Sequence, residues 1–292
     1  MASSPPLLQL LSSFETTAPG TLEAPLRGHI GPSWLQGATT FGGCSAALCL
    51  LGARRVFDES EQLPLRSVLV DWVGAAGGDV HVESSVVRRG KSSAVVRADL
   101  VGAKGIATTA TFTFAKSRAS ALGERRFVPP PPNDLPLPDE SPPFHEALGM
   151  QPPHFFQNFE VRLARRGQLH ASGDEAANWL WIRHAATNDD GSVVGVVPDV
   201  ALLCLADVPP PAILSLLPTG TLETFPNVSS LTWQVNLLDG GTSIVAHPGG
   251  WWLIVQRIEH LHEGFSSCDM ALWGRERHGP ALVSRQAIAV YA

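Results

Sequence analysis

The chain carries the same series of segments twice, in the same order. The stretch "AALCLLG" at Ala46–Gly52 returns as "ALLCLAD" at Ala201–Asp207. Three more pairs keep that order: Ser67–Val73 with Thr232–Leu238, Arg88–Leu100 with Leu261–Trp273, and Gly105–Phe114 with Ala281–Val290. Each match is weak alone, but four in order indicate two copies of one structural unit. The 292 residues suffice for two units of ordinary size.

Within each copy, one apolar helix is followed by several strands. The first helix opens at Gly42 and Gly43 and is expected to end near Arg55. Runs that alternate apolar and polar residues and are rich in Val and Thr then predict strands. These runs are Arg66–Val73, Asp79–Arg89, Ser92–Gly102 and Ile106–Lys116, and the second copy adds lead strands at Phe155–Arg165 and Asn178–Ala186. The predicted class is α+β, with each helix wrapped by an antiparallel sheet.

A proline-rich stretch at Phe127–Phe155 separates the copies. Proline removes backbone donors, so this stretch predicts a semi-rigid and largely extended linker. We therefore expect a first unit at residues 1–116, a linker at 117–153 and a second unit at 154–292. An edge-to-edge join of the two sheets would cover exposed strand edges.

Composition and charge exclude some classes of partner. The formal net charge is −6 and no run of Lys or Arg exceeds two, so nucleic acid is not an expected partner. No apolar stretch approaches the ~20 residues that span a bilayer, and the N-terminus lacks a basic signal-peptide start, so a cytoplasmic protein is the expectation. The four cysteines form no CxxC pair and are expected to be buried free thiols, without metal or cofactor: Cys44, Cys49, Cys204 and Cys268.

Several features along the chain together suggest a family. In the first half they are "FGG" at Phe41–Gly43 and the run Ser67–Leu100; in the second they are Phe159–Arg162, Trp179–Arg183, the helix ending "LAD" and Leu282–Gln286. With these features in order, the chain resembles double-hotdog acyl-CoA thioesterases of the acyl-CoA thioesterase II and thioesterase-like type. The resemblance implies two fused hotdog units, each a curved antiparallel sheet around a central helix. It also implies hydrolysis of acyl-CoA or acyl-carrier thioesters without a covalent intermediate or a cofactor; assembly into homo-oligomers is left open.

The resemblance further implies three residues that hold the attacking water. They are an Asp on the second helix, a Thr or Ser on the following strand and a Gln near the last strand. The matching residues are Asp207, Ser230 (with Thr232 as the alternative) and Gln286. In the first copy we align Gly52, Leu65 and Ala110 with them, which predicts one working site per chain, lined by both units.

The position of Asp207 favours a general base. Val200, Leu203, Cys204 and Asp207 share one helical face, and Pro209 ends the helix at about Asp207. Burial and the negative end of the helix dipole both oppose ionisation, so the pKa of the carboxyl should rise, as water activation requires. The alternative is a helix-end Asp that is solvated or bonded to local backbone.

Each of the other candidate residues has a structural interpretation as well as a functional one. Strand alternation puts Ser230 and Thr232 on one face and Trp233 on the other, where the hydroxyls could simply belong to a polar face. Gln286 could orient a water or make a cross-strand hydrogen bond. Gly42 and Gly43 open the first helix as substrate-binding candidates, and the N–H of Gly43 could bind the thioester carbonyl; the two glycines could instead only allow close packing. Trp34, upstream, is a substrate-contact candidate that is more typical of packing.

Two other functions stay open at this stage. One is an acyltransferase, dehydratase or cyclase of secondary metabolism on the same fold; a dehydratase would need a His at the helix positions, where none stands. The other is a non-catalytic acyl-binding protein, against which Asp207 and Gln286 count. Hydrolysis of acyl thioesters by a water held at Asp207 is the leading hypothesis.

Overall fold

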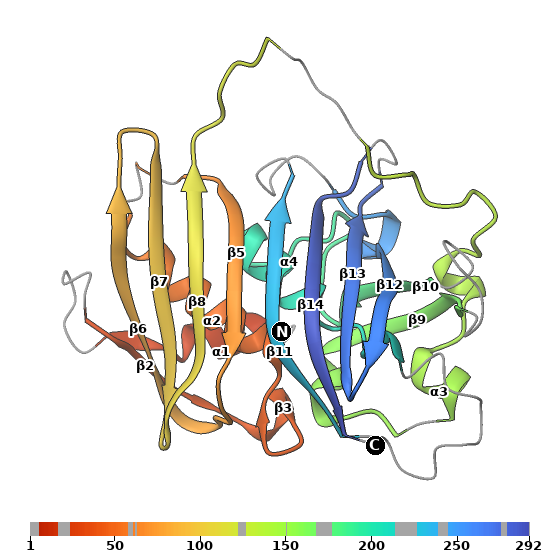
Figure 1. Ribbon diagram of the computed structural model, residues 1–292, viewed down its shortest axis with the longest axis horizontal. Coiled ribbons are helices and arrows are strands. Elements are labelled where there is room, and N and C mark those ends of the chain that lie inside the picture. Colours follow the sequence, from red (N-terminus) through yellow and green to blue (C-terminus); the bar gives the residue numbers. More distant parts are fainter. Residues whose placement is uncertain are drawn as a thin grey trace.

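In the part of the chain that the structure describes, a curved sheet of twelve antiparallel strands carries two central helices on one face (Figure 1). The computed structural model describes residues 6–16, 24–57, 61, 63–121, 127–149, 151–167, 177–213, 227–238, 245–275 and 279–291. The first half contributes β1 (Glu15–Thr16), β2 (Leu26–Ile30), β5 (Leu65–Trp72), β6 (Gly78–Arg89), β7 (Ser93–Gly102) and β8 (Gly105–Ala115). The second contributes β9 (Phe159–Arg165), β10 (Asn178–His184), β11 (Asn227–Leu237), β12 (Trp252–His262), β13 (Phe265–Trp273) and β14 (Leu282–Tyr291).

The strand order is symmetric about the pair formed by β5 and β11. From β5 outward the order is β8, β7, β6, β2, β1, and from β11 outward it is β14, β13, β12, β10, β9. The two halves therefore have the same topology and join edge to edge, as the repeat predicted. This arrangement is a double hotdog fold.

The two central helices are α2 (Gly42–Arg54) and α4 (Pro198–Ala206), close to their expected bounds. Apolar side chains surround both, so each buries most of its surface between the sheet and the other helix. Gly43 makes their contact close: a Cβ there would lie 2.4 Å from the carbonyl oxygen of Cys204. All four cysteines are buried free thiols.

Two matching β-bulges fix which residues of the halves correspond. In β5, Arg66 is the extra residue between Leu65 and Ser67; in β11, Leu231 is the extra residue between Ser230 and Thr232. Leu65 and Ser230 are thus equivalent, as aligned. Their partners Phe114 and Ile288 are equivalent too, which makes Phe112 the counterpart of Gln286.

The alignment of Gln286 with Ala110 was therefore wrong by two residues. A two-residue slip leaves the same side chains on the inner face of a strand, so the apolar pattern alone does not reveal it. Ala110 and Phe112 both face the core of the first half.

The stretch between the halves is less extended than expected. It contains η3 (Pro138–Glu140), α3 (Phe144–Leu148) and η4 (His154–Asn158), so β9 begins at Phe159 rather than at Phe155. The expected boundaries at 116/117 and 153/154 stay predictions. The remaining elements are α1 (Pro6–Ser12), η1 (Pro32–Trp34), β3 (Leu35–Gln36), β4 (Thr39–Thr40) and η6 (Pro248–Gly250).

Part of this stretch covers the outer face of the second half. Leu180 and Ile182 of β10 face the main core, whereas Trp179 and Trp181 point to the other side and form a second apolar cluster with Leu135. The indole of Trp181 donates a 2.9 Å hydrogen bond to the carbonyl oxygen of Pro136. The linker thus shields tryptophans that would otherwise face solvent.

Candidate active site

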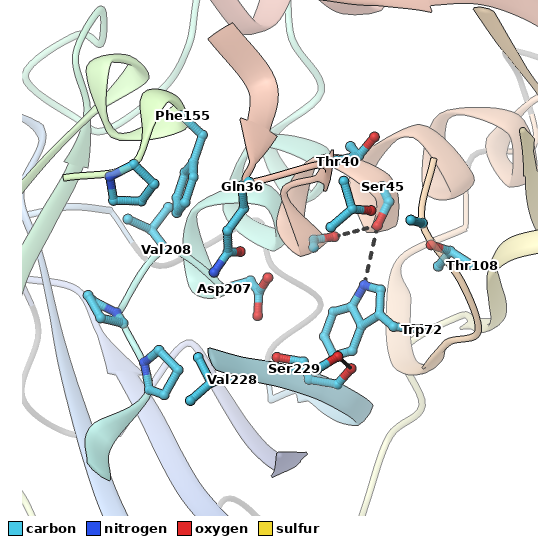
Figure 2. A pocket seen from close by; sticks show the side chains of 18 of the residues that line it. Gln36, Thr40, Ser45, Trp72, Thr108, Phe155, Asp207, Val208, Val228 and Ser229 are labelled. Carbon is cyan, nitrogen blue, oxygen red and sulfur yellow. Dashed lines mark hydrogen bonds between the residues drawn. The ribbon is translucent and has the colours of Figure 1, made fainter. Parts of the chain in front are cut away.

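A cavity of about 610 Å³ lies where the N-terminus of α2 meets the C-terminus of α4 (Figure 2). Residues of both halves line it, as expected for a site between two units. Among them are Gly42, Trp72 and Thr108 from the first half, and Asp207, Ser230 and Gln286 from the second.

Asp207 is held at this junction from two sides. It caps the C-terminus of α4, and its Oδ1 accepts a 2.9 Å hydrogen bond from Nε2 of Gln286 on β14. The backbone N–H of Gly43, at the start of α2, also donates to the carboxylate. A Cβ on Gly42 would lie 2.5 Å from Oδ2, so a glycine is needed for the carboxylate to sit there.

The protein shifts the acidity of this carboxyl strongly. Burial raises the pKa of Asp207 from 3.8 to about 7, although the hydrogen bonds from Gln286 and Gly43 act in the opposite direction. The direction is the one predicted from its place among apolar residues. A carboxyl with a pKa near neutrality can both take and return a proton under ordinary conditions.

The bulge in β11 separates the two candidate hydroxyls. Ser230 pairs with buried Ile288, and Trp233 pairs with Gln286, so Ser230 and Trp233 share the inner face. Thr232 is exposed on the outer face and does not line the cavity. The expectation that Ser230 and Thr232 share a face was wrong, because the extra residue at Leu231 reverses the alternation.

The remaining candidates are divided between cavity and core. No described residue accepts a hydrogen bond from the N–H of Gly42, and Gly42 lines the cavity. The N–H of Gly43 is instead engaged by Asp207. Trp34 is buried with its ring edge-to-face against Phe159, at 6.0 Å between centroids, and is not among the lining residues.

Several lining residues were not singled out from the sequence. Trp72 stands beside Gly42, with its ring 2.9 Å from the position of a Cβ there, and its indole N–H donates to Oγ of Ser45 over 3.3 Å. It also stacks on Trp233, at 6.1 Å between ring centroids. In Figure 2 the side chain of Gln36 extends toward Asp207. Strand alternation places Trp72 on the same inner face as Val68 and Val70, and this pattern could have identified it from the sequence.

The equivalent place in the first half is filled. A Cβ on Gly52 would lie 2.6 Å from Cγ1 of Val82, which leaves no room for a carboxylate there without rearrangement. Leu65 and Phe112, the counterparts of Ser230 and Gln286, are completely buried. The carboxylate, hydroxyl and amide of this site are thus present in the second copy and replaced in the first.

The fold and this junction define a double-hotdog protein with one polar site between its two halves. The sequence matches an acyl-CoA thioesterase N-terminal domain over residues 30–115 and an acyl-CoA thioesterase C-terminal domain over residues 132–290. The chain therefore belongs to the acyl-CoA thioesterase family. A search of curated proteins found no match.

Solved structures share this fold over the whole chain. A conserved hot dog fold protein of unknown function from Alicyclobacillus acidocaldarius has a TM-score of 0.72 at 19% identity, covering 97% of this chain and 98% of that one. The acyl-CoA thioesterase II TesB2 of Mycobacterium marinum has a TM-score of 0.67 at 16% identity, over 98% and 97%. The dehydratase domain of RzxB from Pseudomonas fluorescens has a TM-score of 0.56 at 13% identity, over 97% and 98%. At these identities the likeness concerns the fold alone.

The residues that the structure describes contain neither a membrane-spanning helix nor a cluster of metal-ligand side chains. No helix there is both long and apolar enough to cross a membrane. Within the same ranges, no three His, Cys, Asp or Glu side chains are grouped as a metal site would need.

Proposed function

We propose that the protein hydrolyses acyl-CoA thioesters with a water molecule activated by Asp207. The observation that carries this proposal is the hydrogen-bonded pair of Asp207 and Gln286 at the cavity, with the pKa of Asp207 raised to about 7. Membership of the acyl-CoA thioesterase family supports the reaction class.

In the proposed reaction, a water bound at Oδ2 of Asp207 attacks the thioester carbonyl carbon. Asp207 takes a proton from the water as the new C–O bond forms. The Nε2 of Gln286 keeps Oδ1 occupied, which leaves Oδ2 as the acceptor that faces Gly42. The hydroxyl of Ser230, on the inner face of β11, is the group we assign to holding the same water.

The developing oxyanion needs a donor, and the N–H of Gly42 suits this role. It is a helix-start N–H in the cavity wall without an acceptor among the described residues, next to the carboxylate. Collapse of the tetrahedral intermediate breaks the C–S bond. The proton on Asp207 then goes to the leaving thiolate, which yields the free acid and CoA thiol and restores the carboxylate.

The test is release of free thiol from acyl-CoA substrates of graded chain length. Wild type should release thiol, and Asp207→Asn should lose most of the activity. A 3-hydroxyacyl-CoA should also be followed for enoyl-CoA formation, because a dehydratase on the same fold would eliminate water from it without releasing thiol. Formation of enoyl product without thiol, or tight acyl-CoA binding without turnover, would replace hydrolysis by one of the other two functions.

A further inference from the structure

Beyond the reacting groups, the cavity extends into the first half along a row of inner-face side chains. Trp72 of β5 pairs with Thr108 of β8, and Thr108 pairs with Leu100 of β7. All three line the cavity, and Ser45 at the start of α2 lines it too. We call the part of the cavity lined by Ser45, Trp72, Leu100 and Thr108 the inner branch.

Thr108 is the unusual member of this row. Its side chain is only 2% exposed, between the apolar residues Trp72 and Leu100, yet no described residue accepts from or donates to its hydroxyl. The hydroxyl oxygen is not one of the fully enclosed polar atoms of the described residues, so it is open to the cavity, where water or a ligand can supply its hydrogen bond.

The neighbouring hydroxyls are already engaged, which sets Thr108 apart. The hydroxyl of Ser45 donates to the carbonyl oxygen of Gly42 at 2.8 Å, and that of Thr40 donates to the carbonyl oxygen of Ala76 at 2.7 Å. In the view of Figure 2, Ser45 and Trp72 lie between Asp207 and Thr108. A ligand group that reaches Thr108 would thus lie beyond Ser45 and Trp72 as seen from Asp207, and we assign this place to the acyl chain.

The walls of the inner branch are held in place by contacts of their own. Trp72 is held by Ser45 and by stacking on Trp233. The loop beside it is tied down, since the N–H of Ala76 donates to Oγ1 of Thr39 and its carbonyl accepts from Thr40. An entering ligand must supply the hydrogen bond or leave water there.

We propose that the inner branch selects acyl chains that carry a hydroxyl or keto oxygen, and that Thr108 is the specificity-determining residue. This inference rests on the proposed hydrolysis for its kinetic test. A site with a placed polar group discriminates against the analogue that lacks the matching oxygen, because its own hydroxyl then loses its partner. If the inner branch were lined by apolar groups alone, it would instead favour the unsubstituted acyl chain over the hydroxylated one.

The experiment compares kcat/KM for hexanoyl-CoA with that for 3-, 4- and 5-hydroxyhexanoyl-CoA, by thiol release above an enzyme-free blank, because 4- and 5-hydroxyacyl thioesters can also cyclise to lactones and release thiol. At least one hydroxylated substrate should exceed hexanoyl-CoA by roughly three- to tenfold, the range of one net hydrogen bond. Thr108→Val, of similar shape, should remove that preference, and Thr108→Ser should retain it. Thr109→Val on the same strand is the matched control, because Thr109 points to the outer face, and its ratio should stay at the wild-type value.

A binding measurement separates this inference from the proposed reaction. Calorimetric titration with hexanoate and the three hydroxyhexanoates needs no turnover and should show the same Thr108-dependent preference. If no substrate releases thiol but this preference is present, hydrolysis fails and the specificity inference stands. If hydrolysis occurs and wild type has no preference for any hydroxylated chain, or Thr108→Val keeps the wild-type ratio, the inference is overturned.

Discussion

Gln286 and Asp207 are joined by a 2.9 Å hydrogen bond between the last strand and the end of the second central helix. The amide leaves one carboxylate oxygen facing Gly42 at the start of the first central helix. The same carboxylate also accepts from the N–H of Gly43. The position of the Asp207 carboxylate thus depends on α4, β14 and α2, which come from both halves. Removal of any one of these contacts has its own expected effect on hydrolysis.

The pH dependence of hydrolysis should follow the protonation of Asp207. Burial raises the pKa of this carboxyl to about 7, and only the ionised form can accept a proton from water. We expect kcat/KM to rise about tenfold per pH unit below that value and to level off above it. A profile that is already flat between pH 5 and 8 would contradict the assignment of the base.

Replacement of Gln286 by alanine should weaken the reaction without abolishing it. The variant keeps the base but loses the donor that orients it, so we expect a fall of about tenfold in kcat, less than for loss of the base. Because that hydrogen bond lowers the pKa of Asp207, the pH at which activity rises should move upward. Gln234→Ala, on the exposed face of β11, is the control and should behave as wild type.

The sequence predicted much of this site because the repeat supplies an internal comparison. Asp207 stands where the first copy has Gly52, and Gln286 stands where it has a core residue. The strand alternation was less reliable, since a bulge at Leu231 is not visible in the residue pattern and puts Thr232 outside. The two-residue error at Ala110 has a different origin: period-two patterns fix the face of a strand but not the position along it.

The shape of the cavity could not be predicted in this way. Whether Trp72 and Thr108 line open space depends on how neighbouring side chains fill the inner face, which is packing information. Trp34, upstream of "FGG", was named as a substrate-contact candidate although packing was its more typical role, and in the structure its ring packs against Phe159.

Gly42→Ala should be far more damaging than its size suggests. The new Cβ would lie 2.5 Å from Oδ2 of Asp207 and 2.9 Å from the ring of Trp72, so the carboxylate or the helix start must move. We expect kcat/KM to fall by at least about a hundredfold, since misplacement of the base by 1 Å is costly. Gly31→Ala is the control, because nothing lies within 4 Å of the added carbon and it should leave activity intact.

Ser230→Ala and Thr232→Ala should differ sharply. Ser230 lines the cavity on the inner face of β11, whereas Thr232 is exposed on the outer face. We expect the first to lower kcat by about tenfold, the effect of one lost hydrogen bond to the water, and the second to have no effect. Equal activities in steady-state assays of the two variants would remove Ser230 from the mechanism.

Asp207→Asn should remove hydrolysis and raise stability. Asparagine has nearly the same shape and can still bond a water, but it cannot take its proton, so kcat should fall by on the order of 10²–10⁴. The effect on stability follows from linkage. The pKa of Asp207 is about 7 in the folded protein and 3.8 when exposed, so the folded state binds more protons between these values.

The free energy of unfolding of the wild type therefore loses this contribution as pH rises from about 4 to about 7. Asparagine does not titrate, so the variant avoids that loss, which is at most about 4 kcal/mol and smaller because the cavity admits water. Thermal melts at pH 5 and pH 8 should thus give a larger rise in Tm over wild type at pH 8. An equal difference at both pH values would mean that Asp207 titrates normally, and full activity of the variant would exclude it as the base.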